Sequence, residues 1–316
     1  MTAPGGAPSR REPVTTDIHQ HLWPPRFLAL LRARTSPPLL DGRTLHLPGE
    51  PPYAIDPADH DPAARTERAR ADGLDRALIS LSSPLGIEFL PPEEAAPLLD
   101  AFHDEALALP APFGAWASPC LSVPVPDPAP VVRLLRRGCA GLQLPATALA
   151  DAAGWERCGP LLDGVARLGR PLFVHPGTAP PVPTGSPPWW PALVPYLQQL
   201  HAAWFAFRAF GRPRHPHLRV CFTALAGLAP LHGERLAARG GRDRGRVDPG
   251  VFYETSSYGT RAVDTVVRAV GIDAVVFGSD RPYAVPDVPG LGAAAVHALC
   301  TANPARLLGP AKGARP

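Results

Sequence analysis

The feature that most constrains the fold of this 316-residue chain is a regular alternation of short apolar segments and longer helical patterns. Eight segments have the length and the apolar, β-branched character of buried strands. They are residues 14–19, 77–82, 115–121, 141–144, 171–174, 218–224, 251–254 and 274–278. Alternation of strands and helices is typical of a parallel sheet with crossover helices, and eight repeats favour closure into a (β/α)8 barrel.

The segments between these strands predict eight helices with apolar periodicity close to one helical turn. They span residues 62–71, 92–108, 128–137, 155–168, 192–210, 231–239, 261–270 and 291–301. The alternative is an open, doubly wound sheet that binds a nucleotide. It is disfavoured because the first strand runs into the sequence HQHLWP, and no glycine-rich phosphate-binding turn follows it.

One barrel domain accounts for nearly the whole chain, since an α/β barrel takes about 250 residues. We expect residues 1–13, which are rich in Pro, Gly and Ala, to form a disordered tail, and residues 14–316 to form the domain. The tail lacks the apolar region of a signal peptide, and no apolar run approaches the roughly 20 residues that span a bilayer. A cytoplasmic protein with no membrane partner is therefore expected.

The net charge of +3 and the five widely spaced cysteines exclude two further classes of function. The charge is small for a nucleic-acid-binding protein of this size, so no nucleic-acid partner is expected. The number of cysteines is odd and no C-x-x-C occurs, which argues against a disulfide framework or a zinc–thiolate site.

Two segments interrupt the strand–helix pattern and read as long loops. Residues 35–61 follow the first strand, and residues 177–191 follow the fifth and carry Trp189 and Trp190. In an α/β barrel the loops after the strands form the active-site face. The tryptophan pair therefore either lines an apolar substrate pocket or simply covers the rim of the barrel.

Four residues at strand ends are candidate metal ligands. His19 and His21 lie one residue apart at the end of the first strand, so their side chains point to the same side. His175 ends the fifth strand and Asp280 follows the eighth. Three imidazoles and one carboxylate suit one divalent metal ion, with zinc the first expectation and manganese or iron(II) the alternatives. Such a metal activates bound water or polarises a carbonyl group.

The same stretches resemble the amidohydrolase-related family (amidohydrolase family 2), whose members include aminocarboxymuconate-semialdehyde decarboxylase and γ-resorcylate decarboxylase. The matching motifs are TDIHQH at 16–21, FVHPG at 173–177, YETSSY at 253–258, FGSDRP at 277–282 and ANPARLLG at 302–309. The resemblance covers most of the chain in the same order. It implies a (β/α)8 barrel with a single metal ion, and a small-molecule substrate.

The sequence departs from the family where the sixth strand ends. Family members usually carry a histidine there that transfers protons, whereas this chain has Ala224 in the stretch CFTALAG. General acid–base catalysis is worth roughly a hundred- to ten-thousand-fold in rate. Three accounts remain open: His232 reaches back into the site, Asp280 itself acts as the base, or the barrel is catalytically impaired.

The first functional expectation is hydrolysis of an amide, lactone or ester by metal-activated water, with Asp280 as the base. The alternatives are non-oxidative decarboxylation of an unsaturated or aromatic carboxylic acid, and a non-catalytic barrel that binds a small ligand. Arg281 follows Asp280 directly and either binds a substrate carboxylate or is an ordinary loop arginine. Barrel enzymes of this kind often form homodimers, and that assembly remains open.

Overall fold

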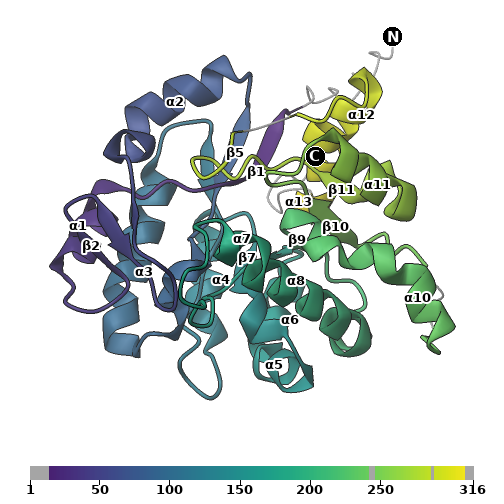
Figure 1. Ribbon diagram of the computed structural model, residues 1–316, viewed down its shortest axis with the longest axis horizontal. Coiled ribbons are helices and arrows are strands. Elements are labelled where there is room, and N and C mark those ends of the chain that lie inside the picture. The colour runs from purple at the N-terminus through teal and green to yellow at the C-terminus, as the bar shows by residue number, and fades with distance from the viewer. Residues whose placement is uncertain (1–13, 242–245, 286–287, 310–316) are drawn as a thin grey trace, which may run out of the picture.

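The computed structural model describes residues 14–241, 246–285 and 288–309, and parallel strands surrounded by helices form its centre (Figure 1). One sheet has the strand order β1-β5-β6 and a second has the order β11-β10-β9-β8-β7. The strands are β1 (Thr16–Gln20), β5 (Arg76–Ile79), β6 (Phe113–Ala115), β7 (Leu142–Pro145), β8 (Leu172–His175), β9 (Val220–Phe222), β10 (Val251–Glu254) and β11 (Val275–Val276).

Backbone hydrogen bonds join the two sheets at both of their edges. Ile18 N donates to Phe277 O at 3.1 Å, beside a parallel bridge between Gln20 and Arg281. At the other edge, Gln143 N donates to Ala117 O at 2.7 Å. The eight strands therefore close into a barrel, which confirms the fold expected from the sequence. Seven strands overlap their predicted segments by two residues or more, whereas β6 ends at Ala115, where the segment predicted for it begins.

Helices cover the outside of the barrel (Figure 1). They are α1 (Pro25–Ala33), α2 (Pro62–Ala71), α3 (Pro92–Ala108), α4 (Pro128–Arg137), α5 (Ala152–Arg157), α6 (Gly159–Arg167), α7 (Trp190–Leu193), α8 (Pro195–Ala206), α9 (Arg212–Arg214), α10 (Gly233–Ala238), α11 (Thr260–Val270), α12 (Ala293–His297) and α13 (Asn303–Leu308). Among the described residues, no helix is long and apolar enough to cross a membrane.

Proline in the first turn marks the start of most of these helices, because a helix leaves its first N–H groups unbonded. The predicted bounds of α2, α3 and α4 are confirmed. The single helix predicted over 155–168 is instead two, which meet at Cys158, where Pro160 occupies the first turn of α6. Helix α1 was not predicted, because its short apolar pattern stands between the first strand and a proline-rich loop.

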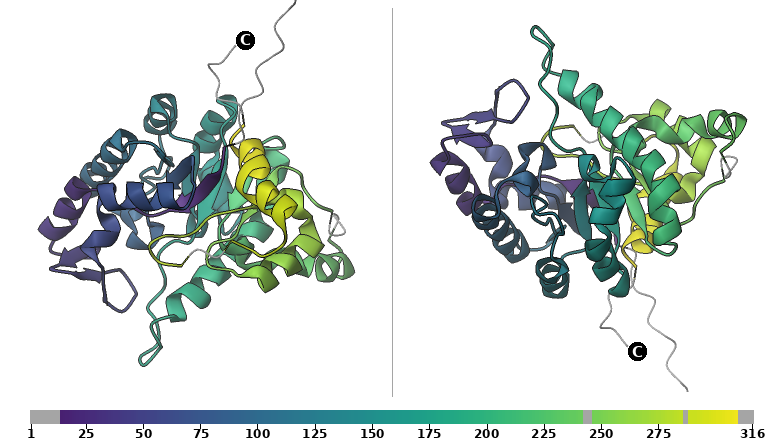
Figure 2. Two further views of the ribbon diagram at one scale, coloured as in Figure 1. Left: turned by 90° about the horizontal axis from the view of Figure 1, so that it is seen from above. Right: turned by 90° about the horizontal axis from the view of Figure 1, so that it is seen from below.

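The amino-terminal end of the barrel interior is apolar. Side chains from six strands, from the residue after β6 and from α13 pack there: Ile18, Leu78, Trp116, Phe173, Cys221, Phe252, Val276, Leu307 and Leu308. Figure 2 shows the C-terminal helices, in yellow, beside the purple β1 strand. Because successive side chains of a strand alternate between its two faces, His175, Thr223 and Glu254 lie above this layer, two residues beyond Phe173, Cys221 and Phe252.

Two loop excursions rise beside the carboxyl ends of the strands (Figure 2). The first contains a small antiparallel sheet that the sequence did not reveal, with strands β2 (Leu39–Asp41), β3 (Thr44–His46) and β4 (Tyr53–Ala54). Val182 N, in the second excursion, donates to Gly49 O at 3.1 Å. Gly49 has φ of +77°, and a Cβ there would lie 2.3 Å from Ala179 O, so this close approach requires glycine. The expected tail, residues 1–13, lies outside the described residues.

Candidate metal centre

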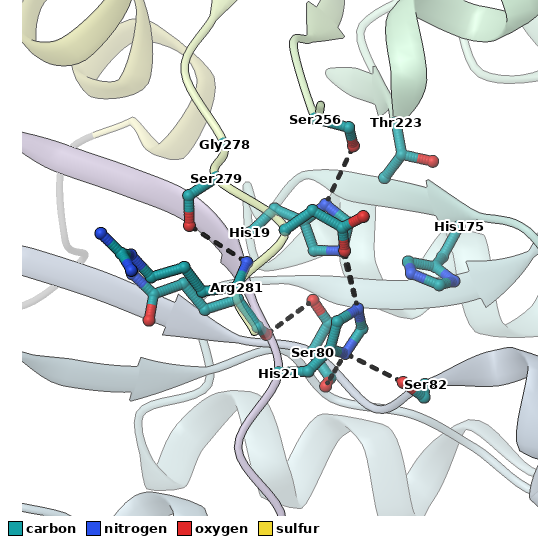
Figure 3. A network of polar contacts seen from close by, with 12 residues as sticks. His19, His21, Ser80, Ser82, His175, Thr223, Ser256, Gly278, Ser279 and Arg281 are labelled. Atoms are coloured by element: carbon teal, nitrogen blue, oxygen red, sulfur yellow. Dashed lines mark hydrogen bonds and ion pairs between the residues drawn. The ribbon is translucent and has the colours of Figure 1, made fainter. Parts of the chain in front are cut away.

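Three histidine side chains converge at the carboxyl end of the barrel (Figure 3). His19 and His21 come from β1 and the residue after it, and their Nε2 atoms are 3.1 Å apart. His175 ends β8, and one ring nitrogen of each histidine lies within 4.8 Å of the other two. All three side chains are buried, with 5% or less of each residue exposed.

The other ring nitrogen of each histidine faces a hydrogen-bond acceptor. Nδ1 of His21 donates to Ser80 O at 2.9 Å, and Nδ1 of His175 donates to Pro176 O at 2.9 Å. A carbonyl oxygen only accepts, so in both rings Nδ1 carries the proton and Nε2 carries a lone pair. Nδ1 of His19 faces Glu254 Oε2 at 3.3 Å, which favours the same tautomer.

Asp280 brings a fourth donor to the same point. Its Oδ1 lies 3.3 Å from His21 Nε2 and 3.6 Å from His19 Nε2. The backbone at Asp280 is left-handed, with φ of +57°, and its N–H donates to His19 O at 2.9 Å. This contact fixes the turn after β11 against the end of β1.

The donor set fits a divalent metal ion. Lone pairs and a carboxylate that face one another over these distances repel unless a cation lies among them. In a tetrahedral zinc site with bonds of about 2.0–2.1 Å, neighbouring ligand atoms are roughly 3.3 Å apart. The distances of 3.1–3.6 Å among His19, His21 and Asp280 are close to that value.

The electrostatics of the site follow from burial and from the two nearby carboxylates. Burial lowers the pKa of His21, and it lowers the pKa of His175 well below the ordinary value. Burial also acts to lower the pKa of His19, but the negative charges of Glu254 and Asp280 outweigh it and raise that pKa overall. Burial acts to raise the pKa of Asp280, whereas His19 and His21 lower it overall.

Glu254 lies in this site, and sequence reasoning missed it. It is fully buried at the end of β10, and besides facing His19 it accepts hydrogen bonds from Ser256 Oγ at 2.7 Å and from Ala224 N at 3.2 Å. A carboxylate behind a ligating histidine orients the ring and raises its basicity. The motif YETSSY contains this residue, but nothing in its spacing from residue 19 shows that the two meet.

Ala224 contributes its backbone to the site. Residues Ala224 to Leu228 all have positive φ, from +44° to +62°, and so form a left-handed turn after β9. A Cβ on Gly227 would lie 2.4 Å from Leu197 O, so glycine is needed where this turn meets α8. The turn directs the Ala224 N–H to Glu254. Ala224 also lines the cavity above the histidines.

A cavity of about 560 Å³ opens above the three histidines and Asp280. Its walls come from the strand ends, the two excursions and the start of α8, and they are rich in Pro and Leu. They also hold four of the five tyrosines of the chain, namely Tyr53, Tyr196, Tyr258 and Tyr283. Among the described residues that line it there is no lysine or arginine. The dimensions and lining are those of a small-molecule pocket.

The remaining residues that the sequence singled out do not line this cavity. Arg281 extends away from it and pairs with Asp72, the residue after α2, at 2.9 Å, so it is not placed to bind a substrate carboxylate. Trp189 is 54% exposed and packs beside Trp190 at the rim, while their neighbours Pro188 and Pro191 line the cavity.

His232 likewise lies outside the cavity. It is exposed, and its ring packs against His201 of α8. The left-handed turn after Ala224 carries the chain away from the strand ends, so His232 does not reach back to the metal centre. Among the described residues, no histidine other than His19, His21 and His175 lines the cavity.

Comparison with known sequences gives no match. No protein-family profile matches the chain, and no curated protein matches it in sequence.

Comparison with solved structures does give matches. An amidohydrolase II structure superposes with a TM-score of 0.73 at 18% identity, covering 93% of this chain and 99% of that chain. The 5-carboxyvanillate decarboxylase of Novosphingobium aromaticivorans with bound manganese gives 0.68 at 17%, covering 94% and 97%. A 2,6-dihydroxybenzoate decarboxylase in complex with 2,6-dihydroxybenzoate gives 0.65 at 16%, covering 94% and 99%. At these identities the likeness establishes the fold alone, a barrel that this chain shares with the three structures.

Proposed function

We propose that this chain is a metal-dependent enzyme that removes carbon dioxide, without oxidation, from an aromatic or unsaturated carboxylic acid. The observation that supports this most is the convergence of three imidazole lone pairs and Asp280 beneath a cavity walled by tyrosine, proline and leucine. A flat apolar ring suits such walls, and its carboxylate would reach the metal centre. Two of the structures that share the fold are decarboxylases of aromatic acids.

The proposed metal ligands are His19, His21, His175 and Asp280. The ion is divalent, with zinc and manganese as the candidates; the decarboxylase of N. aromaticivorans binds manganese. When bound, it would hold oxygen atoms of the substrate and withdraw electron density from them. Because the described cavity lining contains no lysine or arginine, the ion would be the principal balance for the substrate's negative charge.

Decarboxylation requires a proton at the carbon that loses carbon dioxide. The bond between this carbon and the carboxyl group breaks, its electron pair stays on the carbon, and a proton takes the place of the carboxyl group. We assign the proton transfer to Asp280, which lines the cavity with its side chain 25% exposed. Asp280 would recover its proton from water. This role replaces the strand-six histidine, whose position Ala224 occupies.

Hydrolysis of an ester, lactone or amide is the second candidate, and one observation favours it. Hydrolysis needs a base that takes a proton from water at the metal, but it needs no acid that reaches a ring carbon. The lack of a fourth histidine among the described lining residues therefore argues less strongly against hydrolysis than against decarboxylation. The two reactions place Asp280 in the same position and differ in the product.

The test is to load the purified protein with zinc or manganese, measure bound metal, and assay two panels. Aromatic and unsaturated carboxylic acids are scored by carbon dioxide release, and esters, lactones and amides are scored by acid release. His175→Ala serves as the control, because it should lose both metal and turnover. Carbon dioxide release supports the proposal, and acid release alone would support the hydrolase. Bound metal with no turnover in either panel would favour a non-catalytic, ligand-binding barrel.

A further inference from the structure

The cavity contains one carboxyl group that the metal centre does not use. Glu50 lies in the first excursion, between β3 and β4, and lines the cavity together with Pro51, Pro52 and Leu193. Since the described lining has no lysine or arginine, no cation of the protein balances it there. A carboxylate in apolar surroundings is costly unless hydrogen bonds satisfy it.

One oxygen of Glu50 has a partner and the other does not. The Tyr196 hydroxyl donates to Glu50 Oε1 at 2.5 Å, and Tyr196 belongs to α8, which follows the second excursion. Among the described residues, no other side chain or backbone group donates to Glu50. Burial raises the pKa of Glu50, and the hydrogen bond from Tyr196 acts against that rise.

The structure holds Glu50 in place before any ligand arrives. The preceding residue, Gly49, is fixed against Ala179 by its close approach and by the backbone hydrogen bond from Val182. The hydrogen bond between Tyr196 and Glu50 also joins the first excursion to α8. A group fixed in this way loses little conformational entropy when a ligand binds, which favours affinity.

We propose that Glu50 and Tyr196 form a subsite that binds a hydrogen-bond donor of the substrate, a hydroxyl group or an ammonium group. This inference rests on the proposed function for the other end of the substrate, the carboxylate at the metal centre. The substrate class is therefore an apolar or aromatic monocarboxylic acid that carries a donor substituent. A second carboxylate on the ring would face Glu50 and is selected against, because like charges in a cavity without a basic residue repel.

The test uses benzoate probes with the metal-loaded protein and measures dissociation constants by isothermal titration calorimetry. The probes are benzoate, its 3- and 4-hydroxy derivatives, its 3- and 4-aminomethyl derivatives, and the 1,3- and 1,4-benzenedicarboxylates. A hydrogen bond to a charged group is worth roughly tenfold or more in affinity. We therefore expect at least one hydroxy or aminomethyl probe to bind about tenfold more tightly than benzoate, and the dicarboxylates to bind more weakly than benzoate.

Two variants separate the charge of Glu50 from its packing. In Glu50→Gln, the preference for the aminomethyl probe and the penalty on the dicarboxylates should both fall by about tenfold relative to benzoate. Tyr196→Phe retains the carboxylate and should keep the sign of both effects. Glu93→Gln, on the exposed first turn of α3, is the matched control and should leave both ratios as in the wild type.

Two results would overturn the subsite: equal probe ratios in wild type and Glu50→Gln, or no binding of any probe at millimolar concentration. Failure of the proposed function would give a different result. If the probes bind equally well to protein stripped of metal, while the ratios still depend on Glu50, the proposed function fails and the subsite stands.

Discussion

Replacing Glu88 by glutamine should remove a loss of stability that the wild-type protein suffers as the pH rises from about 4.5 to about 7. Glu88 follows β5 and is fully buried. Its Oε1 accepts a hydrogen bond from Ser83 Oγ, but its Oε2 has no partner among the described residues. Burial raises the pKa of Glu88 from 4.5 to about 7, although the Ser83 hydrogen bond opposes the rise.

The sign and the size of the effect follow from this pKa. A carboxyl group with a higher pKa in the folded state favours folding while it is protonated, so the stability is complete below pH 4.5 and falls as pH rises toward and through about 7. At about 1.4 kcal/mol per pKa unit, full ionisation costs roughly 3 kcal/mol. Glutamine has the shape of the protonated acid, keeps an acceptor for Ser83 and does not ionise.

Urea unfolding followed by tryptophan fluorescence would measure the free energy of unfolding of both proteins at about pH 5 and about pH 8.5. Between these values we expect wild type to lose about 2.5 kcal/mol relative to Glu88→Gln. Both proteins are measured with metal bound, so that the titration of the metal-centre histidines is the same in wild type and in Glu88→Gln. Parallel pH dependences would refute the argument, because they would mean that Glu88 ionises in the folded state as it does in the unfolded chain.

Three further predictions concern the metal centre. Glu254→Gln should weaken metal binding by about 10- to 100-fold, measured by competition with a chelator, because it removes the carboxylate behind His19; unchanged affinity would remove Glu254 from the site. Asp280→Ala should lose bound metal by elemental analysis while the circular dichroism stays that of the wild type; full metal occupancy would exclude Asp280 as a ligand. Ala224→His should fold, because Ala224 lines the cavity, and a drop in melting temperature beyond about 8 °C would show that the position is packed.

The strand ends explain why the convergence of the proposed metal ligands could be predicted from the sequence. His19, His21, His175 and Asp280 each follow an apolar strand, and parallel strands of a barrel bring their carboxyl ends to one face. Their convergence therefore needs only the strand order. Helix starts were predictable for a similar local reason, since proline in the first turn marks α2, α3 and α4.

Residues whose role depends on a tertiary contact were not predictable. Glu254 contacts His19 across the barrel, and Glu50 contacts Tyr196 over 146 positions of the chain. Arg281 follows Asp280, but its backbone leaves a left-handed residue and its side chain reaches α2 instead of the cavity. The spacing of residues along the sequence does not show which way these side chains point or which distant residues they contact.

The division between predictable and unpredictable residues has a physical origin that also bears on the reaction. The barrel places the three histidines and Asp280, and any chain with this strand pattern can do so. The four cavity tyrosines come from β4, α8 and the loops after β10 and β11, and burial raises the pKa of Tyr53 to about 12. At neutral pH such hydroxyl groups donate hydrogen bonds and stay protonated. The choice of substrate therefore depends on the first excursion, on α8 and on the loops after β10 and β11. A change of metal should alter the rate more than the order of preference among substrates.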